Sequence, residues 1–184
     1  RNSPIFWIML SFFNKLISID VLRAINTIVS LLIGFSLFKC LKLKFKNQSE
    51  ISLILLTSII FLSPTVRALS IWPYNQIWGL LFFILSIFYF LKFKESSNIH
   101  IKIGLSLKFL FFLILSSYIH PSFAIFIIYY AFHLFYEFKV SKYLIYLILY
   151  CLFLSIPFFL YVSSLDILEI FYRAEGVDVN VSQS

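Results

Sequence analysis

The residues best suited to chemistry lie in one polar stretch between apolar runs, LSPTVRALSIWPYNQIW, which begins at Leu62. It contains Arg67, Trp72, Tyr74 and Asn75. A guanidinium group presents a fork of N–H donors that matches the oxygens of a phosphate. An Arg beside Trp and Tyr at a membrane surface can therefore hold the phosphate of a lipid-linked donor. An interfacial aromatic belt with one Arg extended toward the headgroups is the alternative, and both interpretations stay open.

His120 is a second candidate, because it stands before Pro121 between two apolar runs. Imidazole exchanges a proton near neutral pH, so His120 can shuttle a proton or donate to a phosphate. A His at a helix boundary also commonly bonds a carbonyl group left over at the helix end, which is the competing interpretation.

The remaining ionisable groups form weaker patterns. His133 and Glu137 are spaced i, i+4, but two ligands are too few for a metal site, so a helix-surface pair is the preferred interpretation. A carboxylate-rich tail follows the last apolar run and holds Asp166, Glu169, Glu175 and Asp178. These carboxylates could serve a metal ion or a general base, but a solvated external loop is the preferred interpretation.

The composition determines where such residues must sit. Of 184 residues, 61% are hydrophobic, 21% aromatic and only 12% charged, whereas soluble domains have about 25% charged residues. This balance excludes an ordinary soluble domain, a disordered chain and a nucleic-acid-binding arm. The formal charge of +7 lies in short clusters between apolar runs, which is typical of the cytoplasmic loops of membrane proteins. We therefore expect the lipid bilayer as a partner and no nucleic acid.

A membrane-spanning helix needs about 20 mostly apolar residues. The sequence predicts an all-α integral membrane protein with one polytopic domain and six transmembrane helices, at 21–41, 51–68, 76–93, 101–119, 121–138 and 143–163. Residues 4–18 carry a polar stripe at i, i+3, i+4 and i+7, which predicts an amphipathic juxtamembrane helix on the external surface. The truncated end of a seventh span is the alternative for this segment.

The loops predict the orientation. Lysines fill the first, third and fifth connections, whereas the second has only Arg67 and the fourth has no Lys or Arg. By the positive-inside rule the lysine-rich loops are cytoplasmic. The acidic tail, residues 164–184, then lies outside. Many Phe, Ile and Lys with few Ala and Gly are typical of an AT-rich prokaryotic genome, so we expect a bacterial plasma (inner) membrane.

The order of these features resembles the GT-C superfamily of glycosyltransferases, in particular the family 39 branch of protein O-mannosyltransferases and aminoarabinose transferases. Three segments carry the resemblance: NSPIFWIMLSFFNKL is similar to the juxtamembrane helix, SIDVLRAINTIVSLLIGFSLFKCLKLK to the span that opens with an Arg, and LSPTVRALSIWPYNQIWGLLFFILSIFYFLKF to the next helical hairpin. The match covers residues 2–94 and extends further only by hydropathy.

The resemblance implies a sugar donor on a polyprenyl phosphate and a glycan, lipid or protein acceptor on the external face. It implies lipid-phosphate binding by Arg67, Tyr74 and Arg23. It also implies that the chain is an internal piece of a longer enzyme, with the catalytic Asp or Glu upstream of Arg1 and with a divalent metal ion as a possible cofactor. Trp72, Asn75 and His120 are added as residues lining the site, His120 on its exposure and side alone.

Two other classes of protein stay open. An exopolysaccharide or O-antigen polymerase-type protein also carries an external Arg before one span and a His near a later one, as Arg67 and His120 do here. Ionisable residues within the spans and broken helices are typical of a transporter. Apart from Lys108, the His133/Glu137 pair and Pro157, the spans contain almost nothing of that kind.

Overall fold

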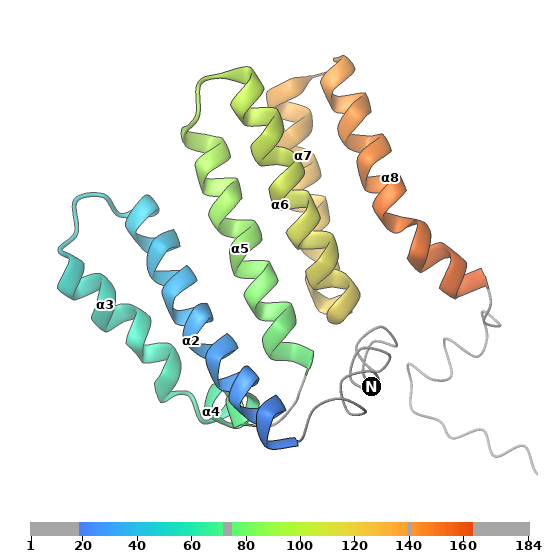
Figure 1. The fold of residues 1–184 in the computed structure, drawn as a ribbon. Coiled ribbons are helices and arrows are strands. Elements are labelled where there is room, and N and C mark those ends of the chain that lie inside the picture. The colour runs from blue at the N-terminus through green and yellow to red at the C-terminus, as the bar shows by residue number, and fades with distance from the viewer. Residues whose placement is uncertain (1–18, 72–74, 140, 164–184) are drawn as a thin grey trace, which may run out of the picture.

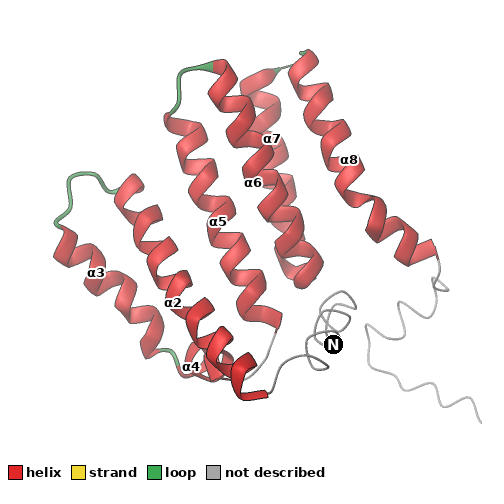
Figure 2. Cartoon of the chain, viewed as in Figure 1, coloured by secondary structure: helices red, strands yellow, loops and turns green. Residues whose placement is uncertain are grey.

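The computed structural model describes residues 19–71, 75–139 and 141–163. Every regular element within them is a helix (Figures 1 and 2). In chain order these are α2 (Ile19–Lys44), α3 (Glu50–Ser58), η1 (Ile59–Leu62), α4 (Pro64–Ile71), α5 (Asn75–Glu95), α6 (Ile99–Ile119), η2 (Pro121–Ile125), α7 (Phe126–Phe138) and α8 (Lys142–Ser163). The predicted juxtamembrane helix at 4–18 and the acidic tail at 164–184 lie outside the described residues.

Four helical segments are long and apolar enough to cross a membrane: Asp20–Lys44, Gln76–Glu95, Ile99–Ile119 and Pro121–Phe138. A fifth is reached if the bent pair Glu50–Leu62 and Pro64–Ile71 counts as one span. The stretch Lys142–Pro157 is a shorter apolar helix. The described part of the chain is thus a helical membrane protein with four or five candidate spans, by length and composition.

The predicted span at 51–68 is not one continuous helix. Helix α3 runs into the 3-10 turn η1, which ends at Leu62, and α4 begins at Pro64 after a bend of 72°. Proline has no N–H to donate, and its ring disfavours helical geometry in the residue before it. Ser63 accordingly has extended backbone angles, φ −62° and ψ 122°. Pro64 thus starts a new helix, and the predicted span at 51–68 corresponds to a pair of helical segments with a bend between them.

Helix α5 occupies the centre of the fold. In Figure 1, α3, α2, α5, α6 and α8 lie side by side, and α7 lies behind α6. One buried cluster joins α5 to α6, α7 and α8 and includes Phe90, Phe93 and Phe109. A second joins α5 to α2 and includes Ile33 and Ile77. Since α5 contributes to both clusters, it couples the two halves of the layer.

Small residues allow α5 and α6 to pack closely, as is common between membrane helices. Ser86, Ser106 and Ser116 are fully buried. The Ser116 hydroxyl donates to the carbonyl of Gly79 on α5, with an oxygen–oxygen distance of 2.8 Å. The hydroxyls of Ser116 and Ser106 are thereby satisfied within the protein, since the Ser106 hydroxyl donates to the carbonyl of Lys102 at 2.9 Å.

Helix α8 contains Pro157, which removes one backbone donor from the helix interior. The carbonyl deprived of its donor is that of Phe153, four residues earlier. One residue further on, the carbonyl of Leu154 accepts a hydrogen bond from the Tyr118 hydroxyl of α6. A side chain of α6 thus ties α8 to its neighbour one residue beyond the carbonyl that Pro157 leaves without its helical donor.

Large apolar side chains cover the outside of the described helices. The most exposed include Ile51 and Leu62 on α3 and η1, Ile128 and Tyr136 on α7, and Phe153 on α8. A soluble monomer rarely exposes such contiguous apolar surface. These faces are suited to contact lipid chains, which require no polar covering.

Gly34 on α2 provides a stability test, because a Cβ placed there would lie 2.7 Å from the ring of Phe61. Gly34→Ala must displace that ring, and overpacking of this kind costs about 1–3 kcal/mol. Gly104→Ala is the matched control, since a Cβ there has no neighbour within 4 Å. We expect a lower thermal unfolding midpoint in detergent for Gly34→Ala only, restored by adding Phe61→Leu. Equal midpoints for the two Ala variants would contradict the close contact.

Candidate functional site

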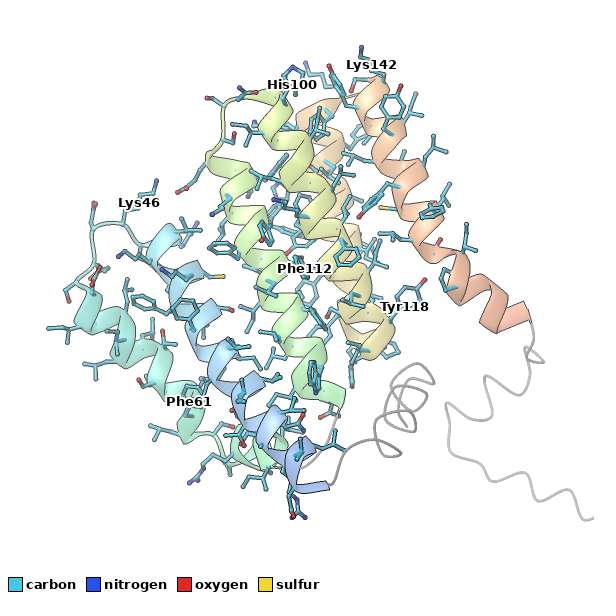
Figure 3. All side chains as sticks on the ribbon, viewed as in Figure 1. Lys46, Phe61, His100, Phe112, Tyr118 and Lys142 are labelled. Carbon is cyan, nitrogen blue, oxygen red and sulfur yellow. The ribbon has the colours of Figure 1, made fainter. Side chains whose placement is uncertain are left out.

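The charged residues divide between the two ends of the helix layer. Arg23 on α2, Arg67 on α4 and His120 after α6 lie at one end, which we call the arginine end. The C-terminal ends of α2, α5 and α7 and the N-terminal ends of α3, α6 and α8 lie at the opposite end, which we call the lysine end (Figure 1). Lys46, His100 and Lys142 mark the lysine end in Figure 3.

At the arginine end, α4 packs against the first turns of α2. The Thr27 hydroxyl lies 3.0 Å from the carbonyl oxygen of Arg23 and 3.4 Å from that of Ser70. The Ser70 hydroxyl in turn donates to the carbonyl of Arg67, at 2.7 Å. Arg23 lies one helical turn before Thr27, and Arg67 lies one helical turn before Ser70. The bend at Pro64 therefore brings together the two elements that carry the predicted phosphate-binding arginines.

The two arginines differ in their surroundings. Arg23 lies 3.4 Å from the carboxylate of Asp20, three residues earlier on the same helix, and its side chain is 40% exposed. Such a surface pair contributes little to stability but partly neutralises the guanidinium. Arg67 is exposed, and no carboxylate among the described residues lies within ion-pair distance of it. Arg67 is therefore the better placed of the two to receive an external anion.

A hydrogen bond that the sequence analysis did not anticipate lies beside this contact. The indole N–H of Trp78 on α5 donates to the side-chain oxygen of Asn26 on α2, at 2.9 Å, and Asn26 is only 3% exposed. Asn26 lies one turn beyond Arg23, so this bond anchors the start of α2 to α5. The available signal was an Asn near one end of the first predicted span and a Trp near the same end of the third, 76–93.

His120 is held at the junction of α6 and η2. Its N–H donates to the carbonyl of Ser116 at 2.8 Å, and its carbonyl accepts from Phe123 at 3.1 Å. Its ring meets the ring of Phe123 edge-on, with centroids 5.8 Å apart. A Cβ on Gly79 would lie 3.4 Å from the Cβ of His120, so His120 packs closely on α5. Within the described residues nothing joins His120 to Arg23 or Arg67.

Of the other three predicted site residues, the structure describes one. Trp72 and Tyr74 lie outside the described residues, and Asn75 is the first residue of α5. Within the described ranges no group of three or more His, Cys, Asp or Glu side chains is placed to hold a metal ion. The expected divalent cofactor therefore stays a prediction.

His133 and Glu137, predicted as a helix-surface pair, contact other residues instead of each other. Glu137 forms an ion pair with Lys102 of α6, whose side chain is only 14% exposed. The His133 ring instead packs against the rings of Phe90 and Tyr129, with centroids 5.3 and 4.6 Å away. The ion pair of Lys102 and Glu137 links α6 to α7 near the lysine end. His133 and Glu137 belong to no group of metal-binding side chains within the described residues.

No family model, curated protein or solved structure matches the chain.

The bond between Trp78 and Asn26 can be tested by a double-mutant cycle. Trp78→Phe removes the indole donor, and Asn26→Ala removes the acceptor. Interhelical hydrogen bonds in membranes contribute about 0.6 kcal/mol on average and up to about 1.7 kcal/mol. We expect a coupling energy of about 1 kcal/mol from thermal or chemical unfolding in detergent. Strictly additive effects would show that the two side chains do not interact.

Proposed function

We propose that the chain is part of a membrane glycosyltransferase that transfers a sugar from a polyprenyl-phosphate donor to an acceptor on the external face. One observation carries the proposal. Arg67 is exposed and has no carboxylate partner among the described residues, on a short helix that packs beside Arg23 at the end opposite the lysines. A phosphate at the membrane surface fits such a group, because guanidinium binds phosphate oxygens in pairs.

The proposed topology has six spans, with the bent pair α3–α4 and helix α8 each counted as one. The charge distribution supports it. The described lysines that gather near the lysine end are Lys39, Lys42, Lys44, Lys46, Lys92, Lys94, Lys102, Lys139 and Lys142. By the positive-inside rule this end is cytoplasmic, so the arginine end is external. The proposed location is a bacterial plasma membrane.

In the proposed reaction, Arg67 binds the donor phosphate, assisted by Tyr74 and Arg23. A carboxylate expected upstream of Arg1 removes the proton of the acceptor hydroxyl, which attacks the anomeric carbon of the sugar. The bond from that carbon to the phosphate oxygen breaks, and the negative charge that develops on the lipid phosphate is stabilised by the guanidinium. Trp72, Asn75 and His120 are proposed to line the site. A divalent ion in the full-length enzyme would add further charge stabilisation.

An exopolysaccharide or O-antigen polymerase-type protein is the second candidate. The feature that favours it is that Arg67 and His120 lie at the same end of the layer on different elements. Both candidates use an external arginine for a lipid-linked substrate. They differ in the upstream carboxylate, which only the glycosyltransferase requires.

Substitution of Arg67 tests the proposed phosphate contact. A charge-assisted hydrogen bond contributes about 1.5–3 kcal/mol, so we expect Arg67→Ala in the full-length protein to slow sugar transfer by about ten- to hundredfold. Arg67→Lys should recover part of the rate, because it keeps the charge but loses the fork. The assay is transfer from a radiolabelled polyprenyl-phosphate sugar in isolated membranes.

Lys44→Ala is the control for this assay, because Lys44 is an exposed cation at the opposite end of α2. It should leave the transfer rate within about twofold of the unmodified protein. Unchanged transfer in Arg67→Ala would remove the proposed phosphate contact.

The orientation has its own test. In a cysteine-free background (Cys40→Ala, Cys151→Ser), Thr65→Cys and Ser97→Cys each place one exposed thiol, at the arginine end and the lysine end respectively. A membrane-impermeant maleimide added to whole spheroplasts should label Cys at 65 only, and should label Cys at 97 after permeabilisation. Labelling in the reverse order would overturn the proposed topology.

A further inference from the structure

A cavity of about 560 Å³ lies at the lysine end between α2 and α5. Four lysines and four apolar side chains surround it, together with Ser36. The lining residues are Phe35, Ser36, Lys39, Lys42, Leu43, Lys46, Leu85, Phe88 and Lys92. The sequence analysis used these lysines only as markers of orientation, and the proposed sugar transfer at the arginine end does not involve them.

The cavity follows from the spacing of two facing stripes. On α2, Phe35, Lys39 and Lys42 recur at i, i+4 and i+7, which places them on one side of the helix, and Lys46 follows in the turn after it. On α5 the matching residues recur at i, i+3 and i+7, from Leu85 through Phe88 to Lys92. Each stripe is therefore apolar toward the membrane interior and cationic toward the helix end.

Only two of the four ammonium groups have a carboxylate partner among the described residues. Lys42 forms an ion pair with Glu50, and Lys46 lies 2.7 Å from the carboxylate of Glu95. Lys39 and Lys92 have no carboxylate within ion-pair distance among the described residues.

Aromatic rings of the lining hold the two remaining ammonium groups in position. The Lys39 nitrogen lies 5.2 Å from the ring centre of Phe35, and the Lys92 nitrogen lies 4.6 Å from that of Phe88. Such contacts position a cation without neutralising it. Four ammonium groups therefore line the cavity, and two of them pair with carboxylates that lie outside the lining. The lining itself carries only positive charge, which suits an anionic ligand.

We infer that this cavity binds one anionic phospholipid of the leaflet at the lysine end, with its phosphate between Lys39 and Lys92. An acyl chain lies against Phe35, Leu85 and Phe88. A soluble phosphate would use the lysines but leave this apolar wall uncovered, whereas a phospholipid satisfies both parts. The volume falls within the range of about 300–1,000 Å³ typical of small-molecule sites. Basic pockets between transmembrane helices are suited to anionic lipid headgroups.

The test uses two double variants of the full-length protein that carry the same charge change. Lys39→Gln with Lys92→Gln removes the two proposed phosphate ligands. Lys44→Gln with Lys94→Gln removes two exposed lysines from the same ends of the same helices, outside the cavity. Each protein is reconstituted in nanodiscs containing phosphatidylglycerol or phosphatidylcholine, and native mass spectrometry after release measures the lipid retained.

We expect the unmodified protein and the Lys44/Lys94 variant to retain one phosphatidylglycerol. The Lys39/Lys92 variant should retain it about tenfold less well, because two charge-assisted contacts are lost. Phe35→Ser should also weaken retention, because it removes part of the apolar wall. Thermal midpoints of all variants in detergent establish that they are folded.

Three outcomes would overturn the inference. Equal loss in both double variants would mean that diffuse charge, and not the cavity, attracts the lipid. Equal retention of phosphatidylcholine would remove the requirement for an anionic headgroup. Displacement of phosphatidylglycerol by millimolar glycerol 3-phosphate, with no effect of Phe35→Ser, would make the site one for soluble phosphate.

Discussion

The absence of water in the bilayer core is the constraint on which the rest of this structure depends. Each backbone N–H and C=O at that depth must find a partner within the protein, and a helix provides it locally. Two side chains of α6 also bond the backbone of a neighbouring helix. Tyr118 donates to the carbonyl of Leu154 on α8, near Pro157, and Ser116 donates to the carbonyl of Gly79 on α5. The few polar side chains in the spans therefore join helices to one another.

The same constraint separates the charges. Ionised groups are costly in the hydrocarbon, so they gather at the two ends of the layer. At the lysine end four lysines converge between α2 and α5, and only two of them have a carboxylate partner among the described residues. At the arginine end the bend at Pro64 turns α4 back to the start of α2. Arg67 on α4 therefore lies near the first turns of α2, which carry Arg23. Both ends are thus suited to phosphate, with different geometries.

The two candidate sites differ in what holds them in place. The arginine end is organised by backbone and side-chain hydrogen bonds, from Thr27 to Ser70 and from Trp78 to Asn26. The cavity at the lysine end is organised by cations over aromatic rings, which leaves the ammonium groups charged and accessible. A phosphate bound to exposed Arg67 could leave after a reaction. A lipid held between two helices would instead act as part of the fold.

The sequence alone determined the helical class and, within the described residues, the approximate positions of the long apolar helices, because long apolar runs in a polytopic chain have no other stable form. It also determined which residues share an end, since the lysine clusters and Arg67 alternate along the chain. Tertiary structure decided the rest. Three features depend on how helices pack across long sequence separations. They are the new helix that starts at Pro64, the contact of Asn26 with Trp78, and the position of Lys46 and Lys92 at one cavity. Hydropathy records how deep a residue lies and not which neighbour it faces, so these pairings could not be derived from it.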